Sequence, residues 1–422
     1  MSHLNAFLRS GNRPTLAASF IYFDVSFMVW TLLGALGNFI AADFGLSGTE
    51  KGLMTATPIL AGSFFRLILG PLGDRFGGRR VGIVGLALTT IPLLIGWRFA
   101  DSFSTVMLTG LLLGVAGASF AVALPLASRW YPPEHQGLAM GIAGAGNSGT
   151  VLASLFAPRL AREFGWEAVF GLALIPILCT LAAFILLAKD SPRTPRAFGL
   201  KQYGRVLGQA DTGWFAVMYA VTFGGFVGLG GYLAIFLREQ YDLSRVQAGD
   251  LTALCVFAAS FARPVGGYLS DRFGGIRLLL TLLGLIALLM LGVATLPALA
   301  IMIPLLIAIM AVFGMGNGAV FQLVPLRFPN DIGTVTGLVG AAGGVGGFLL
   351  PFLLGSLYDR TGTYATGFLV FTVGALLTLA ALIVAQRGWR GTWAPTGSAA
   401  RTGLSRALPA LHATPRLAEA GD

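Results

Sequence analysis

The strongest constraint in this sequence is a succession of long apolar runs. Between Ala17 and Gln386 there are twelve runs long enough to cross a bilayer as helices, a crossing that takes about 20 apolar residues. The runs are continuous and rich in Leu, Ala, Gly and Phe, whereas the strands of a membrane barrel would alternate apolar and polar residues. The sequence therefore predicts an all-α membrane protein with twelve transmembrane helices. The expected helices span 17–41, 53–72, 81–99, 105–130, 137–159, 166–188, 212–237, 246–269, 276–296, 299–324, 333–355 and 363–386.

Composition and charge exclude a water-soluble fold. Of the 422 residues, 55% are hydrophobic and 11% are charged, against about 25% charged in a soluble domain. The net charge of +10 is unevenly spread: with a cytosolic N-terminus, the tails and even-numbered loops hold 19 Lys and Arg residues, and the opposite loops hold seven. This asymmetry follows the positive-inside rule and predicts a multi-pass protein of the cytoplasmic (inner) membrane with both termini in the cytoplasm. The charge thus indicates a lipid bilayer as partner, and no nucleic acid.

Neither a disulfide nor a metal or cofactor site is expected. Cys179 and Cys255 both lie in apolar runs and are predicted to be small core residues. His3, His135 and His412 are scattered along the chain without metal-ligand spacing. No nucleophile–base constellation or phosphate-binding loop is evident, so an enzyme is not predicted.

The chain contains an internal repeat. Residues 66–80, RLILGPLGDRFGGRR, match residues 263–277, RPVGGYLSDRFGGIR, at an offset of 197. A second pair, GIAGAGNSG at 141–149 and GLVGAAGGV at 337–345, matches at an offset of 196. Such a duplication is expected of a transporter built from two pseudo-symmetric six-helix bundles, with its substrate held between them near the membrane midplane.

Four segments follow from the repeat and the polar stretches. We expect an N-terminal six-helix bundle at 1–188 and a C-terminal six-helix bundle at 212–386. The polar residues at 189–211 predict a cytosolic linker between them, and the Ala-, Thr-, Pro- and Arg-rich residues 387–422 predict a disordered cytosolic tail.

Two arginines carry the functional argument. Arg66 and Arg263 lie inside apolar runs and each begins its copy of the repeat. An arginine near the bilayer centre costs roughly 2.5–3.5 kcal/mol on insertion scales, and neither segment offers a carboxylate within a turn. Buried ion pairs with other helices are the alternative, but Asp24 is the one acid well inside a predicted helix, so at most one arginine could be neutralised. We expect the two guanidinium groups to face each other across a central site that binds an anion.

The geometry of the guanidinium group limits which anion the site can bind. Its planar fork of donors suits a planar oxyanion, which it can bind bidentately. Large sugar phosphates would need more cationic and polar groups than the sequence supplies. Nitrate and nitrite fit best, and formate or bicarbonate remain possible on these grounds.

The segment GPLGDRFGGRR and its copy GYLSDRFGGIR resemble the helix 2–3 signature of the major facilitator superfamily, and the resemblance covers nearly the whole chain. It implies that the motif stabilises one side of an alternating-access cycle. We therefore assign its residues a conformational role rather than substrate binding. They are Gly73, Asp74, Arg75, Gly77, Arg80, Asp271 and Arg272.

Within that superfamily, two Gly-rich segments resemble the signature segments of the nitrate/nitrite porter (NarK-type) family. They are AGAGNSG at 143–149 and GLVGAAGGVGGFLLP at 337–351, in predicted helices 5 and 11, and the signature glycines are Gly144, Gly146, Gly149, Gly340, Gly343 and Gly344. The resemblance implies that Arg66 and Arg263 bind the substrate, with Phe120, Tyr219 and Asn147 beside it. Without the resemblance, these last three residues fit core packing or cross-helix bonding equally well. Gly343 stands in helix 11 where Asn147 stands in helix 5, so the two halves differ at the site.

The coupling mode stays open at this point. Asp24 lies either near the cytosolic interface or at a position to couple protons. Uptake of an anion against an inside-negative potential costs about 2.3 kcal/mol per charge per 100 mV, so nitrate/nitrite antiport or nitrate/proton symport is required. The alternatives are a carrier of another small anion or organic acid, an anion channel, and a non-transporting membrane sensor. We expect the protein to function as a monomer.

Overall fold

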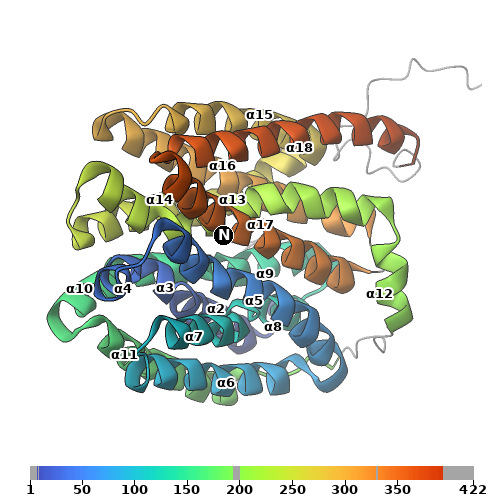
Figure 1. Cartoon of the computed structure of the whole chain (residues 1–422). Coiled ribbons are helices and arrows are strands. Elements are labelled where there is room, and N and C mark those ends of the chain that lie inside the picture. The colour runs from blue at the N-terminus through green and yellow to red at the C-terminus, as the bar shows by residue number, and fades with distance from the viewer. Residues whose placement is uncertain (1–6, 8, 193–199, 329–330, 393–422) are drawn as a thin grey trace, which may run out of the picture.

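The computed structural model describes residue 7 and residues 9–192, 200–328 and 331–392, and its described elements are all helical (Figure 1). Before the linker they are α2 (Arg13–Trp30), α3 (Leu32–Ala35), α4 (Gly37–Phe44), α5 (Gly48–Phe76), α6 (Gly78–Arg98), α7 (Phe103–Gly117), α8 (Phe120–Ser128), α9 (Pro133–Gly144), the 3-10 turn η1 (Ala145–Ser148), α10 (Gly149–Phe164) and α11 (Trp166–Leu187). Within the linker region lies α12 (Leu200–Leu207). The helices that follow are α13 (Ala210–Tyr241), α14 (Arg245–Phe273), α15 (Gly275–Ala294), α16 (Leu299–Arg327), α17 (Ile332–Thr361) and α18 (Ala365–Thr392).

Ten spans in the described residues are long and apolar enough to cross a membrane. The other two expected spans, 17–41 and 137–159, are not continuous helices, and the expected helix 105–130 is also interrupted, between α7 and α8. In this respect the prediction was wrong. Helix 1 is interrupted at Thr31 and Leu36, which separate α2, α3 and α4. Helix 5 is interrupted by η1 between α9 and α10. The total of twelve crossings stays a prediction.

Two further boundaries differ from the sequence expectation. The linker region 189–211 contains the helix α12, because Leu200–Leu207 places its apolar residues on one face. Arg205 of α12 forms an ion pair with Asp331, N to O 3.0 Å, which docks this helix near the start of α17. The last helix continues to Thr392, past the expected start of the tail, and residues 393–422 lie outside the described part.

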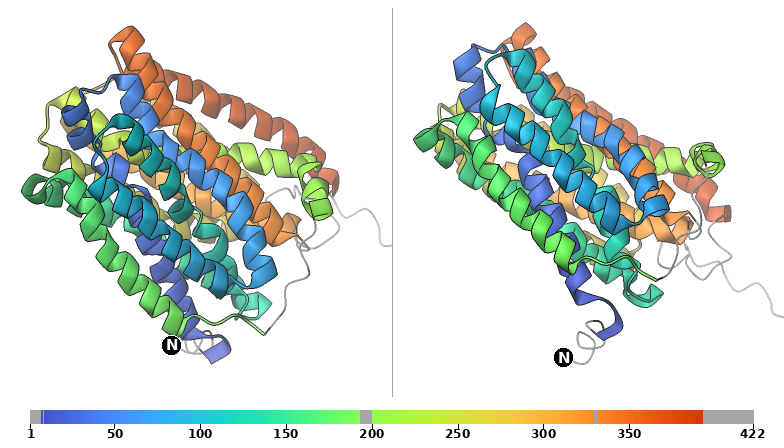
Figure 2. Two further views of the ribbon diagram at one scale, coloured as in Figure 1. Left: turned by 60° about the horizontal axis from the view of Figure 1, so that its bottom comes forward. Right: turned by 90° about the horizontal axis from the view of Figure 1, so that it is seen from below.

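The elements before and after the linker form two groups of helices that face each other. In Figure 1 the blue to green helices α2 to α11 lie together, the yellow-green to red helices α13 to α18 lie together, and α12 stands beside both. Helix α5 packs along α17, and α10 packs along α14, so both pairs cross between the groups. The two views of Figure 2 show α17 beside α5. We call these groups the N-half and the C-half.

The two copies of the repeat begin and end their helices, α5 and α14, in the same way. α5 and α14 both begin with a capping box, formed by Ser47 with Glu50 in one and by Ser244 with Gln247 in the other. Both helices end at a glycine with positive φ, 92° at Gly77 and 91° at Gly274, a conformation that other residues rarely adopt. The offset of 197 therefore holds over the whole length of this helix.

Glycines bring α5 and α17 into backbone contact. A Cβ atom at Gly52 would lie 2.5 Å from the carbonyl oxygen of Pro351, and one at Gly355 would lie 2.0 Å from that of Gly48. A Cβ at Gly344 would lie 1.8 Å from Oγ of Ser63. No larger residue fits at these positions without displacing the opposite helix, so the seam between the halves depends on glycine.

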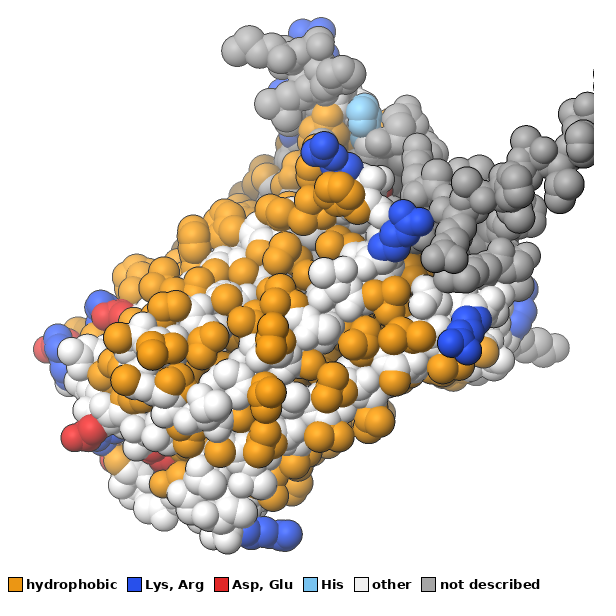
Figure 3. All heavy atoms as spheres, turned by 90° about the horizontal axis from the view of Figure 1, so that it is seen from above, with side chains coloured by type: hydrophobic (Ala, Val, Ile, Leu, Met, Phe, Trp, Pro, Cys, Tyr) orange, Lys and Arg blue, Asp and Glu red, His pale blue; other side chains and the backbone are white. Residues whose placement is uncertain are grey.

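Charged side chains gather at the two ends of the molecule, and hydrophobic side chains cover the flank between them (Figure 3). We call the end that carries α12, the start of α2 and the end of α18 the terminal end. At the opposite end, the ion pairs Lys51–Glu239 (2.6 Å) and Arg159–Asp250 (2.5 Å) join the N-half to the C-half. The apolar belt and charged ends are those of a protein that crosses a bilayer.

Candidate functional site

Arg66 lies in α5 and is 1% exposed. Its Nε donates a hydrogen bond to the carbonyl oxygen of Gly117 (3.1 Å), and its Nη1 donates one to the carbonyl oxygen of Gly340 (2.8 Å). Gly117 can accept because α7 ends there and the N–H of Ala121 turns instead to Ala118. The Nη2 atom is buried and has no hydrogen-bond partner among the described residues. Arg66 is thus fixed by both halves and keeps one donor group free.

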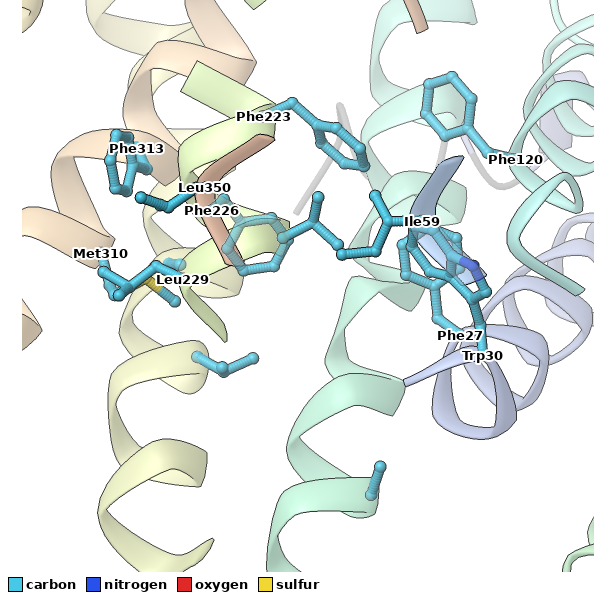
Figure 4. Close-up of a cluster of buried hydrophobic side chains, with 14 of the residues drawn as sticks. Phe27, Trp30, Ile59, Phe120, Phe223, Phe226, Leu229, Met310, Phe313 and Leu350 are labelled. Carbon is cyan, nitrogen blue, oxygen red and sulfur yellow. The ribbon is translucent and has the colours of Figure 1, made fainter. Parts of the chain in front are cut away.

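Three aromatic rings surround the Arg66 guanidinium. Its central carbon lies 5.4 Å from the ring centroid of Trp30, 5.6 Å from that of Phe120 and 5.2 Å from that of Phe223. Figure 4 shows Trp30 and Phe120 on the N-half and Phe223 on the C-half around one region between the helices. Ring faces stabilise a desolvated cation by cation–π attraction, which partly offsets the cost of burying it.

Arg263 in α14 lies close enough to Arg66 for the two charges to repel. Its guanidinium carbon is 5.8 Å from the Phe120 ring centroid and 5.7 Å from that of Phe321. The side chain is partly exposed, and its buried Nη1 atom has no hydrogen-bond partner among the described residues. Phe120 therefore contacts both arginines, as a shared wall of one site.

No ion pair between described residues includes Arg66 or Arg263. Asp24, the acid that could have neutralised one of them, instead accepts a hydrogen bond from Oγ of Ser148 at 2.5 Å. The expected pair of cations without a neighbouring carboxylate is therefore present in the described part of the chain. Two nearby desolvated cations favour the binding of an anion between them.

Tyr219 in α13 lies beside both guanidinium groups. Its ring stacks on Phe223 with centroids 4.9 Å apart and meets Phe321 edge-on at 4.8 Å. The hydroxyl lies within hydrogen-bonding reach of Arg263 but makes no well-aligned hydrogen bond in the described structure. A Cβ atom at Gly343 would lie 2.4 Å from the Tyr219 ring, which explains a glycine at this point of α17.

Asn147 lies in η1 and is 1% exposed, and its Oδ1 atom has no hydrogen-bond partner among the described residues. Gly144, three residues earlier, faces Arg263: a Cβ there would lie 3.9 Å from the guanidinium carbon. The η1 turn that contains Asn147 packs against α14, the helix that carries Arg263. The structure thus brings Arg66, Arg263, Phe120 and Tyr219 together, and it places Asn147 in a turn that packs against α14. That these residues bind the substrate stays a prediction.

The remaining signature glycines serve close packing. A Cβ at Gly146 would lie 2.7 Å from the Phe23 ring, and one at Gly149 would lie 1.8 Å from the carbonyl oxygen of Asp24. Gly340 differs from these, since a Cβ there would make an ordinary 3.5 Å contact with Phe120. What Gly340 supplies to the site is its carbonyl oxygen, which binds Arg66.

The helix 2–3 motif lies at the terminal end, away from the arginines. Asp74 forms an ion pair with Arg129 at the end of α8, the kind of partner expected for it, whereas Asp271 accepts a hydrogen bond from Nε2 of Gln322 at 2.8 Å. Burial raises the pKa of Tyr203 in α12 to about 12, and the nearby Asp74 carboxylate adds to the rise, which places α12 beside the motif. These contacts fit a conformational role.

The other motif residues follow the repeat. Arg75 lies over the ring of Phe76 at 5.1 Å, and Arg272 lies over that of Phe273 at 5.4 Å. Gly73 is buried and Arg80 is exposed at the start of α6. The backbone N–H of the neighbouring Arg79 donates to Asp190 at 2.9 Å, a cap that sequence reasoning missed.

Sequence reasoning also missed the aromatic and carbonyl partners of the arginines. Trp30, Phe223 and Phe321 are three of 47 aromatic residues, and only their distances to the guanidinium groups distinguish them. One available signal is the repeat, because Phe27 and Trp30 recur as Phe223 and Phe226 at the offset of 196. Backbone acceptors such as Gly117 carry no sequence signal.

Similar proteins show the family of this chain. The chain matches the Major Facilitator Superfamily over residues 18–351 and 216–410. It is 37% identical over 367 residues to a probable nitrate/nitrite transporter, NarK2, of Mycobacterium tuberculosis, covering 86% of this chain and 91% of that protein. It is 34% identical to the nitrite extrusion protein of Bacillus subtilis (85% and 90% covered) and 35% identical to a probable nitrate/nitrite antiporter, NarK1, of Thermus thermophilus (85% and 88% covered).

The fold also matches a solved transporter. A bacterial homologue of the human lysosomal transporter Spinster, in an inward-facing and occupied conformation, superposes with a TM-score of 0.68 at 18% identity, covering 88% of this chain and 96% of that one. At that identity the likeness shows the fold alone. With the repeat, the paired arginines and the Gly-rich segments, the comparisons show that this chain is a membrane protein of the major facilitator superfamily and belongs, within it, to the nitrate/nitrite porter family.

Proposed function

We propose that the protein is a secondary active transporter of nitrate and nitrite that works by alternating access between its two halves. The observation that carries this proposal is the pair of arginines, Arg66 and Arg263, at one site between the halves with no ion-pair partner among the described residues. The nitrate and nitrite transporters related to this chain support the choice of anion.

The free donors fit a small planar anion. Nη2 of Arg66 and Nη1 of Arg263 are buried and have no hydrogen-bond partner in the described part of the chain, and the Tyr219 hydroxyl lies beside them. Oxygens of nitrate or nitrite would accept from these groups, while Phe120 and Phe223 cover the anion's faces and exclude water. Without the anion, repulsion between the two cations opposes their approach, so the anion favours the state in which the halves close on it.

Energy coupling has two forms that satisfy the membrane potential. Exchange of one nitrate for one nitrite moves no net charge, and symport with two or more protons moves positive charge inward. Both forms use the same arginine site, so the site does not distinguish exchange from symport. A transport measurement distinguishes them.

The test is nitrate uptake into liposomes that contain the purified protein. One set is preloaded with nitrite, and a second is empty with an inward proton gradient. Uptake that requires internal nitrite identifies exchange, and uptake driven by the gradient identifies symport. Counterflow and saturation exclude a channel. Absence of nitrate and nitrite movement in both sets, with correctly folded protein, would refute the proposed substrate.

We also propose that the terminal end faces the cytoplasm, that the membrane is the inner membrane and that a single chain transports. The excess of Lys and Arg in the loops assigned to the terminal end supports this orientation. Labelling of single cysteines introduced at Arg80 and at Lys51, in intact cells with an impermeant reagent, tests it. Only the Lys51 position should react, and reaction at position 80 alone would reverse the orientation.

A further inference from the structure

The two halves differ in one polar cluster beside the site. At the offset of 196, Asn147 and Ser148 of helix 5 correspond to Gly343 and Gly344 of α17. Asp24 of α2 corresponds to Ala220 of α13 at the same offset. Three polar residues of the N-half thus stand where the C-half has glycine and alanine.

The structure shows a similar close crossing of two helices in each half, displaced by one residue. Helix α2 crosses helix 5 so closely that a Cβ at Gly149 would lie 1.8 Å from the carbonyl oxygen of Asp24. In the C-half, a Cβ at Gly346 would lie 2.2 Å from the carbonyl oxygen of Ala220. At the offset of 196, Gly346 corresponds to Thr150 rather than to Gly149, so the two crossings are shifted by one residue. The C-half makes its crossing without a carboxylate at residue 220, so close packing alone does not require the carboxylate of Asp24.

The polar cluster coincides with a difference in helix geometry. Ser148 donates to the Asp24 carboxylate at 2.5 Å and is the last residue of η1, the turn that interrupts helix 5. Its counterpart α17 is one continuous helix from Ile332 to Thr361. The hydrogen bond therefore ties the interrupted segment to α2 at the point where the N-half departs from the repeat.

Asn147 is the residue whose position the Ser148–Asp24 hydrogen bond would fix. It is buried, its Oδ1 atom lacks a partner among the described residues, and its turn packs against α14, the helix that carries Arg263. We propose that Asp24 and Ser148 are positioning residues, which hold the η1 turn so that the Asn147 amide contacts the anion bound by Arg66 and Arg263. This inference rests on the proposed function for the anion, while the tie itself is a property of the protein.

The hydrogen bond from Ser148 needs an acceptor at residue 24 but not a negative charge. Conservative variants therefore distinguish a role of the hydrogen bond from a role of the charge. In nitrite-preloaded liposomes, we expect Asp24→Ala to raise the KM for nitrate about tenfold with the maximal rate changed less than about twofold. Ser148→Gly, which installs the C-half residue, should behave alike. Asp24→Asn, whose amide oxygen can accept from Ser148, should remain close to the wild type. Ala220→Ser, at the matched crossing, is the control and should change nothing.

A double-mutant cycle tests whether Asp24 acts through Asn147. Asn147→Gly should raise KM about as much as Asp24→Ala, and the double variant should be no worse than Asn147→Gly alone. Additive effects would overturn the proposal. So would Asp24→Asn behaving like Asp24→Ala, or losing proton-driven uptake while exchange is kept, because either result would show that the ionisable group itself is used.

Backbone hydrogen exchange supplies a readout that does not depend on transport. Exchange over residues 145–148 should be faster in Asp24→Ala and Ser148→Gly than in the wild type, and unchanged in Asp24→Asn. Equal exchange in all variants would refute the tie. If the wild type moves neither nitrate nor nitrite but the exchange pattern holds, the proposed substrate fails and the positioning pair stands.

Discussion

Arg66 and Arg263 occupy equivalent places in the repeat but not equivalent surroundings. Arg66 is buried, donates to two carbonyl oxygens and lies against three rings. Arg263 is partly exposed, lies against two rings and keeps Nη1 without a partner among the described residues. One arginine is fixed before any anion arrives, and the other retains freedom to respond to it. A duplicated fold can thus supply a rigid and an adjustable cation to a single site.

The largest expected effect comes from replacing the fixed cation. Arg66→Lys keeps the charge but cannot bond Gly117, Gly340 and an anion together, so uptake at low nitrate should fall about 100-fold. Arg263→Lys should reduce it about tenfold. The Arg66 variant should also lower the melting temperature in detergent, whereas the Arg263 variant should not. Equal losses in both assays would abolish the distinction between the two arginines.

Two glycines of α17 provide the next contrast. Gly343→Ala places a Cβ 2.4 Å from the Tyr219 ring and should reduce uptake by roughly tenfold or more, because the ring must move away from the arginines. Gly340→Ala makes a 3.5 Å contact and should stay within about threefold of the wild type. Gly374→Ala, with open space around it, serves as control. A severe Gly340→Ala phenotype would show that the seam is tighter than the structure indicates.

Phe120 and Phe321 test how the two arginines share their surroundings. Phe120 lies beside both cations, so Phe120→Leu should weaken nitrate affinity about five- to tenfold. Phe321 contacts Arg263 alone among the pair, so Phe321→Leu should weaken it about threefold. Inhibition of labelled nitrate uptake by unlabelled nitrate gives both values. The reverse order would indicate that Arg263, rather than Arg66, dominates binding.

The smallest expected difference lies in the two copies of the helix 2–3 motif. Asp74→Asn removes an ion pair with Arg129 that is about three-quarters buried, and should change the uptake rate about two- to fivefold. Asp271→Asn preserves an acceptor for Gln322 and should be nearly silent. Initial rates at saturating nitrate give the comparison. Matching effects would mean that the copies are functionally equivalent despite their different partners.

Long apolar runs made most of the fold predictable, because a helix in lipid must satisfy its own backbone. The interruptions were not predictable. The Gly-rich segments 141–149 and 337–345 look alike, yet the first contains η1 and the second lies within continuous α17. The difference coincides with Ser148, which has a tertiary partner on α2, whereas its counterpart Gly344 packs against Ser63. The glycines are visible in the sequence, but these tertiary contacts are not.

The charged part of the site was predictable for an energetic reason. An arginine inside an apolar run has few uses other than a buried ion pair or an anion site, so Arg66 and Arg263 stood out at once. Tyr219, Phe120 and Asn147 came from the family resemblance. The structure places Tyr219 and Phe120 beside the arginines, and Asn147 in a turn that packs against α14. Residues that act through an aromatic ring face or a backbone oxygen give no comparable signal in the sequence.

The glycine seam between α5 and α17 has a consequence for the motion between the halves. Helices that interlock through long side chains rest in a few registers, and each step between registers requires several rotamers to change together. At this seam, Gly48, Gly52 and Gly355 present backbone atoms instead. The energy of tilting one helix on the other therefore varies smoothly with angle. The rate of movement between the halves is then set by the polar contacts at the two ends of the molecule and by the anion in the site. The contact between α5 and α17 adds little to the energy barrier.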